Sequence, residues 1–363
     1  MTVAQTSTQV RPRTKTRWLR PVTAGQIAVW QIAALAVLVT VQPFDVTGIV
    51  VAAVAVLVVA ATSVRRGGLC LYQWIGVRLG YLRRARPSPS QDPIEAVLPG
   101  LRVIRHVDRA GNRVGLAAAG SDRIALVRLP SGVRPDFDVL VTALREAQQR
   151  SDIPLAGAQL VVWAVPGPTS VEPMRIFWLA LRYRPSVAPG AALARGGGAT
   201  GADRAAASAA LGLVGRLAEA GQAASVLDEP ELRQDLLVAI GADPRAFAGN
   251  TPGARPVVTV AESWRSWSIG RLTQTTFAPG LRVANEVLGV LVPGTEFTCS
   301  SLLLRRTPRG TSETSVSLRL GYVAKHAQQR PEPMVKRLAG DLYPCNGRQS
   351  AALMRSLPLA TPD

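Results

Sequence analysis

The sequence predicts an α+β protein, in which a mixed α/β cytoplasmic domain follows an N-terminal two-helix transmembrane hairpin. Two observations carry this prediction. Residues 25–64 contain two apolar runs without Lys, Arg or Glu, separated by only four residues. From residue 91 onwards, short β-type segments mix with amphipathic helices, and hairpin turns connect them instead of a strict βαβ alternation.

The N-terminal tail, residues 1–24, is basic and precedes the apolar runs Gly25–Val41 and Val46–Val64. Each run is long enough for a membrane helix, which needs about 17–25 apolar residues. The connection between the runs carries only Asp45 as a charged residue. Because basic flanks stay on the cytoplasmic side, we expect both chain ends in the cytoplasm and the hairpin in the inner (plasma) membrane. A cleaved signal peptide fits less well because a second apolar run follows at once. A buried soluble hairpin fits less well because both flanks are so basic.

A juxtamembrane amphipathic segment and a proline-rich linker occupy residues 65–90. Apolar side chains occur on nearly every face between Leu69 and Leu82, and arginines cluster at both ends. So much apolar surface needs cover from lipid or from a partner helix. We interpret the segment as a membrane anchor or as a docking helix for another subunit. The docking candidates are Leu71, Trp74, Ile75, Arg78 and Leu82.

The net charge of +18 is concentrated next to the predicted membrane segment. Residues 1–90 hold 11 Lys and Arg against one Asp, a net of +10, and residues 91–363 hold 31 against 23, a net of +8. Positive-inside topology and anionic headgroups account for the larger share. No basic stripe is interleaved with aromatic residues, so we predict no nucleic-acid partner.

The three cysteines, Cys70, Cys299 and Cys345, are widely spaced and form no CxxC motif. The two histidines, His106 and His326, lie in different regions. These spacings do not match a zinc site or a disulfide framework. We therefore predict no metal, no cofactor and a reducing compartment.

The domain at residues 91–363 begins with short strands around one clear helix. Strands are expected at Val97–Val107, Val114–Ala118, Ile124–Leu129, Ala158–Val165 and Arg175–Tyr183, and the helix is expected at Phe137–Arg150. The following stretch, Arg184–Asp203, contains three consecutive glycines without a P-loop lysine. We interpret it as a disordered loop, and a subdomain break near residues 185–203 is a further hypothesis.

Two helices are predicted after this loop. Asp203–Ala220 is Ala-rich, with Asp203 as its N-cap. Asp228–Gly241 has the clearest end signals in the chain. Asp228 and Glu231 have the spacing of a capping box, and Gly241 is typical of a helix C-terminus.

The C-terminal part is predicted to be strand-rich. Strands are expected at Pro256–Ala261, Trp267–Gln274, Thr295–Arg305 and Thr314–Lys325, the last two as an antiparallel pair with Pro308–Gly310 in the turn. Short helices are expected at Leu281–Gly289, Met334–Ala339 and Arg348–Leu357.

No motif for catalysis emerges from the sequence, since GxSxG, HExxH and Walker A patterns are all missing. Asp136 and Asp138 have the D-x-D form that holds a metal–nucleotide in many glycosyltransferases. They also open a predicted helix, where Asp is favoured as a cap. We favour the helix start, and a membrane-anchored glycosyltransferase-like enzyme is the alternative.

Trp264 and Trp267 form the other conspicuous pair, beside Arg265 and Arg271. Two such residues serve either as core residues near a strand edge or as anchors for a partner. We favour the core. The alternative is a cytoplasmic receptor domain for secretion substrates that uses both tryptophans as contacts.

The layout of basic tail, apolar hairpin, Arg/aromatic segment and mixed α/β domain resembles the EccE family, a core membrane component of the type VII (ESX) secretion system of mycobacteria and related actinobacteria. Local similarity supports this: Asn112-Arg-Val-Gly115 before a hairpin, DFDVLVTALREA from Asp136, and Asn346-Gly-Arg-Gln349 before Leu353–Leu359.

The resemblance implies a non-enzymatic structural subunit that braces EccB, EccC and EccD at the periphery of a large inner-membrane hetero-oligomer. EccC is the ATPase of that complex, and EccD supplies most of its membrane helices. The family has no catalytic residues to carry over, which agrees with the missing active-site motifs.

Overall fold

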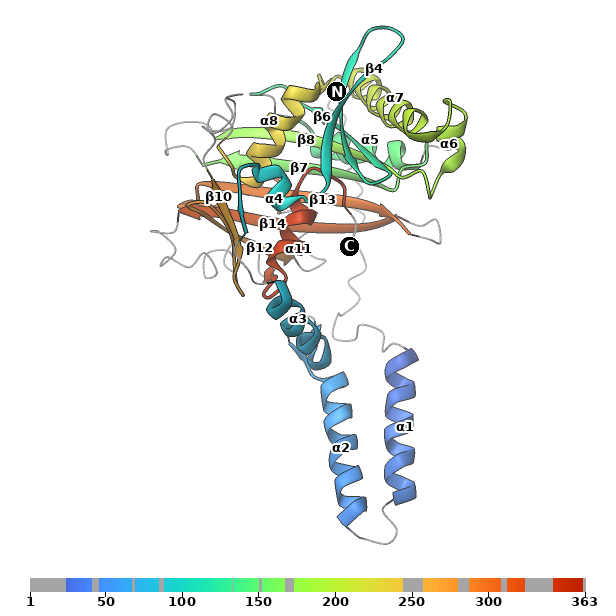
Figure 1. Cartoon of the computed structure of the whole chain (residues 1–363), viewed down its shortest axis with the longest axis vertical. Coiled ribbons are helices and arrows are strands. Elements are labelled where there is room, and N and C mark those ends of the chain that lie inside the picture. The colour runs from blue at the N-terminus through green and yellow to red at the C-terminus, as the bar shows by residue number, and fades with distance from the viewer. Residues whose placement is uncertain are drawn as a thin grey trace, which may run out of the picture. The chain divides into compact units, whose positions relative to one another are not determined.

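The computed structural model describes residues 24–40, 46–66, 69–84, 88–132, 134–149, 152–166, 173–243, 257–279, 287–307, 312–323 and 342–361. The chain divides into two compact units, Met1–Leu79 and Gly80–Asp363, whose elements are labelled in Figure 1.

The first unit contains the two apolar runs as helices α1 (Ala24–Thr40) and α2 (Val46–Ser63), which pack against each other. One polar cluster joins them. The Trp30 indole donates a hydrogen bond to Thr62 Oγ1 at 3.0 Å, and Gln26 Nε2 donates to the Thr62 carbonyl at 2.9 Å. The two predicted helices are therefore present and form an antiparallel hairpin.

The predicted crossing of a bilayer by this hairpin is not supported. Within the described residues, no helix combines the length and the hydropathy that a membrane span requires.

The amphipathic segment forms its own helix instead of continuing α2. Strands β1 (Arg65–Arg66) and β2 (Leu69–Cys70) form a short antiparallel ladder after α2, and α3 (Leu71–Arg84) follows directly. Within the predicted linker, Ser88–Ser90 form strand β3, which pairs with the second unit's sheet.

The second unit is built on one 13-stranded sheet in which all pairs of neighbouring strands are antiparallel. Its order is β3-β10-β11-β12-β14-β13-β7-β8-β6-β5-β4, while β15 also pairs with β12 and β9 with β6. Besides β3, the strands are β4 (Leu101–Val107), β5 (Arg113–Ala119), β6 (Asp122–Arg128), β7 (Gly157–Val165), β8 (Met174–Tyr183), β9 (Ser225–Val226), β10 (Val258–Glu262), β11 (Trp267–Ile269), β12 (Leu272–Pro279), β13 (Phe297–Arg306), β14 (Ser312–Val323) and β15 (Leu342–Pro344).

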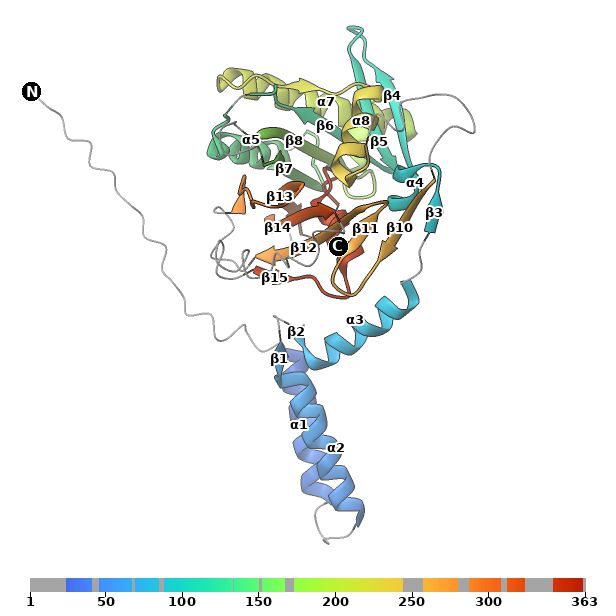
Figure 2. The ribbon, with the colours of Figure 1, turned by 90° about the vertical axis from the view of Figure 1, so that its left-hand side faces the viewer.

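Helices cover both faces of this sheet, as Figures 1 and 2 show. They are α4 (Pro93–Val97), α5 (Phe137–Gln149), α6 (Pro189–Leu193), α7 (Gly198–Glu219), α8 (Glu229–Ile240) and α11 (Gln349–Ser356). Helices α5, α6 and α7 belong to one core cluster, and α4, α8 and α11 contact the other. Strand β7 shows why a core forms on each face of the sheet, because Leu160 and Val162 lie in the first cluster and Val161 in the second. A third, smaller cluster includes Phe277, Leu318 and Leu320.

The α+β prediction is thus confirmed, and most predicted strands and helices of the second unit are present. Trp267–Gln274 is split by a turn at Gly270 into β11 and β12. The start of the predicted strand Val97–Val107 is the end of α4 instead. The helix at Met334–Ala339, the turn at Pro308–Gly310 and most of Leu281–Gly289 lie outside the described residues.

The predicted disordered loop at Arg184–Asp203 is wrong. It contains α6 and the first turns of α7. Gly196, Gly197 and Gly198 all have positive φ and form the tight turn between these helices. α7 therefore starts earlier than predicted, and Asp203 does not cap it but forms an ion pair with Arg123 of β6.

Helix α8 has the predicted ends. The Asp228 side chain accepts a hydrogen bond from Glu231 N at 3.0 Å, and Glu231 Oε2 accepts one from Asp228 N at 3.0 Å. Pro230 lies in the first turn, and Gly241 ends the helix with a left-handed φ of 83°. The local end signals in the sequence are sufficient here because capping involves only neighbouring residues.

Candidate functional site

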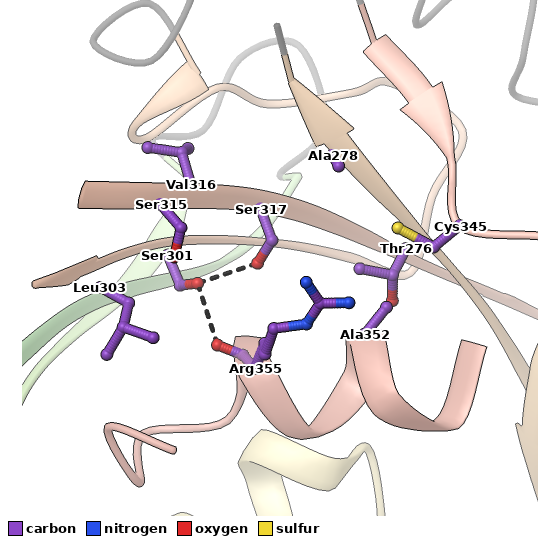
Figure 3. A pocket seen from close by; sticks show the side chains of 10 residues that line it. All are labelled: Thr276, Ala278, Ser301, Leu303, Ser315, Val316, Ser317, Cys345, Ala352 and Arg355. Atoms are coloured by element: carbon purple, nitrogen blue, oxygen red, sulfur yellow. Dashed lines mark hydrogen bonds between the residues drawn. The ribbon is translucent and has the colours of Figure 1, made fainter. Parts of the chain in front are cut away.

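A small cavity lies between α11 and the face of β12, β13 and β14, and Figure 3 shows its ten lining residues. Ser301 Oγ hydrogen-bonds Ser317 Oγ at 2.9 Å and donates to the Arg355 carbonyl at 3.4 Å. The lining contains no Asp, Glu or His, so it offers Ser301 no general base. About 30 Å³ of internal space accommodates one or two water molecules.

Asp136 and Asp138 lie where the sequence places them, at the start of α5. Asp136 Oδ1 accepts a hydrogen bond from Asp138 N at 2.9 Å, which is a helix-capping interaction. Between them, Phe137 packs against Phe177 of β8, with ring centroids 6.1 Å apart. Both aspartates are exposed, and no group of three metal-ligating side chains occurs in the described residues. The geometry is that of a helix start.

Trp264 and Trp267 do not form one surface. Trp267 is only 4% exposed and belongs to the second core cluster. Trp264 is half-buried, and its indole meets the ring of Tyr81 edge-on, with centroids 5.4 Å apart. The structure therefore puts one tryptophan in the core and the other against the last turn of α3.

That last turn of α3 is fixed to the body of the second unit by further contacts. Arg84 donates to the Gly347 carbonyl at 3.3 Å, and its Nε lies 3.7 Å from Glu262 Oε2. The Glu262 carboxylate is almost buried and also accepts a hydrogen bond from Ser350 N at the start of α11. Tyr81, Arg84, Trp264 and Glu262 thus form a joint between α3 and the sheet. Sequence reasoning missed it, because its members are far apart in the chain.

The docking candidates all lie on α3, and this helix contains no buried residue. Leu71, Ile75 and Leu82 are 47%, 56% and 65% exposed. Arg78 is also exposed, whereas Trp74 is half-buried. α3 therefore presents a row of large apolar side chains that the described residues leave uncovered.

Two buried polar networks were not predicted from the sequence. In the first, Arg319 of β14 is fully buried and donates to Gln274 Oε1 at 2.6 Å and to the Ala239 carbonyl at the end of α8. Gln274 Nε2 donates to the next carbonyl, that of Ile240, at 2.7 Å. The ring of Phe297 lies under the guanidinium, 5.3 Å away. Together these groups bind the C-terminus of α8 to the sheet.

The second network surrounds Asp235 on the inner face of α8. Its carboxylate accepts hydrogen bonds from the Trp178 indole at 2.8 Å and from Arg128 at 3.0 and 3.1 Å. Burial raises the pKa of Asp235, although Trp178 and Arg128 act to lower it. Both networks join secondary structure elements, and neither lines a cavity among those described.

Comparison with known proteins gives a family match over part of the chain. Residues 173–278 match the family model described as the type VII ESX secretion system translocon, EccE. The matched region starts at β8, includes α6, α7, α8, β10 and β11, and ends in β12. No curated protein matches the chain. Over residues 173–278, the chain is therefore similar to the EccE family of the type VII ESX secretion system translocon.

Proposed function

We propose that the chain is a non-enzymatic structural subunit of an inner-membrane type VII (ESX) secretion complex, which it braces at the periphery beside EccB-, EccC- and EccD-like subunits. The observation that carries this proposal is the EccE match over residues 173–278. It is supported by the Arg319 and Asp235 networks, because both join secondary structure elements and neither lines a described cavity.

The hairpin α1–α2 is the proposed membrane anchor, with both chain ends in the cytoplasm. Its outward side chains support this, because Ile32, Leu38 and Leu57 are among many large apolar residues more than 60% exposed. Such a surface is unfavourable in water. Alkaline extraction of membranes should leave the full chain in the pellet. Recovery in the supernatant would refute the anchor, and labelling of introduced cysteines from either side of the membrane tests the topology.

The complex is tested by isolating the tagged full chain from membranes in mild detergent, with native electrophoresis and mass spectrometry of the product. We expect a very large assembly that contains an ATPase and a subunit with many membrane helices. Isolation of the chain alone, under conditions that preserve other membrane complexes, would contradict the proposal.

The docking residues Leu71, Trp74, Ile75, Arg78 and Leu82 are proposed to hold α3 against lipid or a neighbouring subunit. The triple variant L71S/W74S/I75S removes apolar surface from α3 and should weaken that attachment. A control is L193S, because Leu193 is an exposed leucine outside α3, on α6. Normal recovery of the complex with the triple variant would exclude α3 as the contact with a subunit.

The glycosyltransferase-like alternative requires a metal at Asp136 and Asp138. Because the first of these caps the backbone of the second, we expect no thermal shift with millimolar Mn²⁺ and nucleotide sugars. A shift that disappears in D136N/D138N would revive the enzymatic hypothesis. For the receptor alternative, only Trp264 offers partly exposed surface, since Trp267 is in the core.

A further inference from the structure

We propose that α3 lies in the plane of an anionic bilayer surface, with one face in the acyl region and two arginines on lipid phosphates. This inference rests on the proposed membrane location of the chain and deepens it by choosing lipid over a protein subunit as the contact of α3.

The spacing of the exposed leucines and isoleucine defines the face. Leu71, Ile75, Leu79 and Leu82 follow one another at intervals of four, four and three residues, and all are 47–65% exposed. Residues at these intervals stack along one side of a helix. At about 100° per residue the four span an arc of about 80°. An apolar arc of this width is expected for a helix that lies in the membrane–water interface with one face in the acyl region.

Two arginines border this row on opposite sides. On the same helical projection, Arg78 lies about 20° beyond Leu71 and Arg83 about 40° beyond Leu79. Both side chains are exposed, and neither forms an ion pair with any other described residue. Arginines in this position extend to the headgroups while their stems remain next to the acyl chains.

The opposite side of the helix is occupied by the chain's own contacts. Tyr81 meets Trp264, and Arg84 meets Glu262 and the Gly347 carbonyl. Arg84 lies about 180° from the centre of the apolar row. Tyr81 and Arg84 therefore form their contacts on a side of α3 that the apolar row, Arg78 and Arg83 do not occupy.

Charge favours an anionic occupant. No acidic residue occurs between Asp45 and Asp92, whereas six arginines do. A protein groove suited to this helix would need to combine apolar side chains with acidic groups on both of its rims. A leaflet of anionic phospholipid has both features everywhere, and α3 follows directly on the short ladder after the apolar hairpin. We therefore assign the row to lipid.

Spin labels on the full chain in lipid nanodiscs test the assignment. The native cysteines Cys70, Cys299 and Cys345 are buried. The spectra of spin-labelled I75C and Q73C are compared with that of the unsubstituted chain after the same labelling. Gln73 is exposed but lies about 160° from Ile75. With 30% phosphatidylglycerol, the Ile75 label should be accessible to oxygen and protected from a water-soluble nickel complex. The Gln73 label should be accessible to nickel.

Charge removal provides the second measurement. Each arginine should contribute about fivefold to the ratio of membrane-bound to free α3, so R78Q/R83Q should lower this ratio by roughly 25-fold. R109Q/R113Q removes the same charge from exposed positions of the β4–β5 hairpin and should have no effect.

Three results would overturn the inference: equal nickel access at both labels, protection that is as strong in pure phosphatidylcholine, or protection that appears only when other subunits are bound. The last result would assign the row to a protein partner. Isolation of the secretion complex with R78Q/R83Q separates the two proposals, because loss of lipid contact should leave the composition of the complex unchanged.

Discussion

Two glycines in the same helix should respond in opposite ways to alanine. Gly201 and Gly215 both lie in α7. A Cβ at Gly201 would collide with the backbone carbonyl of Ala192 in α6, whereas a Cβ at Gly215 would have no heavy atom within 4 Å. Comparison of the two alanine variants therefore separates the effect of helix propensity from the effect of close packing between α6 and α7.

The magnitudes follow from these surroundings. In an open helical site, replacement of Gly by Ala stabilises by up to about 1 kcal/mol, and this is the expectation for G215A. Helix propensity can stabilise G201A by the same amount at most. The backbone of α6 cannot rotate away from the new methyl group as a flexible side chain can. Overpacking of this kind costs about 1–3 kcal/mol. We expect G201A to be destabilised by about 1–2 kcal/mol and to differ from G215A by about 2–3 kcal/mol.

Urea unfolding of the full chain, followed by tryptophan fluorescence, measures both variants. The midpoints should move in opposite directions, with unchanged dependence on urea concentration. The reasoning would be refuted if G201A were as stable as G215A, since α6 and α7 would then not be held at the distance that the structure shows.

Three further outcomes are expected. D228A removes the cap of α8 and should cost about 1 kcal/mol, with faster hydrogen exchange in the first turn of that helix. R319M leaves the Ala239 carbonyl and Gln274 Oε1 without a charged donor. The free energy of unfolding should therefore fall by at least about 2 kcal/mol in the same assay. For Asp92, burial acts to raise the pKa, but the hydrogen bond and charge of Arg233 and two backbone amides outweigh it, so the pKa lies below its usual value. A lowered carboxyl pKa stabilises the fold above about pH 4 and loses that effect as pH falls through the folded value. D92N should thus be less stable than the parent at neutral pH, by under about 1 kcal/mol because the pair is partly exposed, and the two should converge in acid.

Sequence patterns predicted the elements whose signals are local. α8 is the clearest case, since its cap, its first-turn proline and its final glycine are all within the helix or next to it. The apolar runs likewise gave helices close to the predicted bounds. The β13–β14 pair was recognisable because both strands are long and adjacent in the sequence.

Elements that depend on distant residues were not predictable in this way. Glycines at the start of α7 disfavour a helix, but burial of Gly201 and Ala202 against α6 overrides that preference. Strand β3 has the composition of a linker and becomes a strand only because Ser90 pairs with Val258. The joint at Tyr81 and Trp264 combines residues that no local pattern connects.

The same is true of the buried arginine. In the sequence, Arg319 is one basic residue among many, and nothing near it indicates burial. Its acceptors are on β12 and at the end of α8. The candidate surface on α3 was predicted as a set of residues, but Leu79 and Arg83 join it only once the face of the helix is defined by exposure.

The position of β13 in the middle of the sheet has a consequence for synthesis of the chain. β13 lies between β14 and β7, with Leu302 opposite Leu160, and Gln159 of β7 accepts its hydrogen bond from Ala360 near the C-terminus. At about 5–20 residues per second, a ribosome takes roughly 7–30 s to proceed from β7 to β13. Throughout that interval the nascent chain carries an open, apolar strand edge, which is prone to wrong pairing. A chain that terminates before β13 therefore retains its helical hairpin but lacks the partner for this edge, and it is a natural substrate for chaperones and proteases.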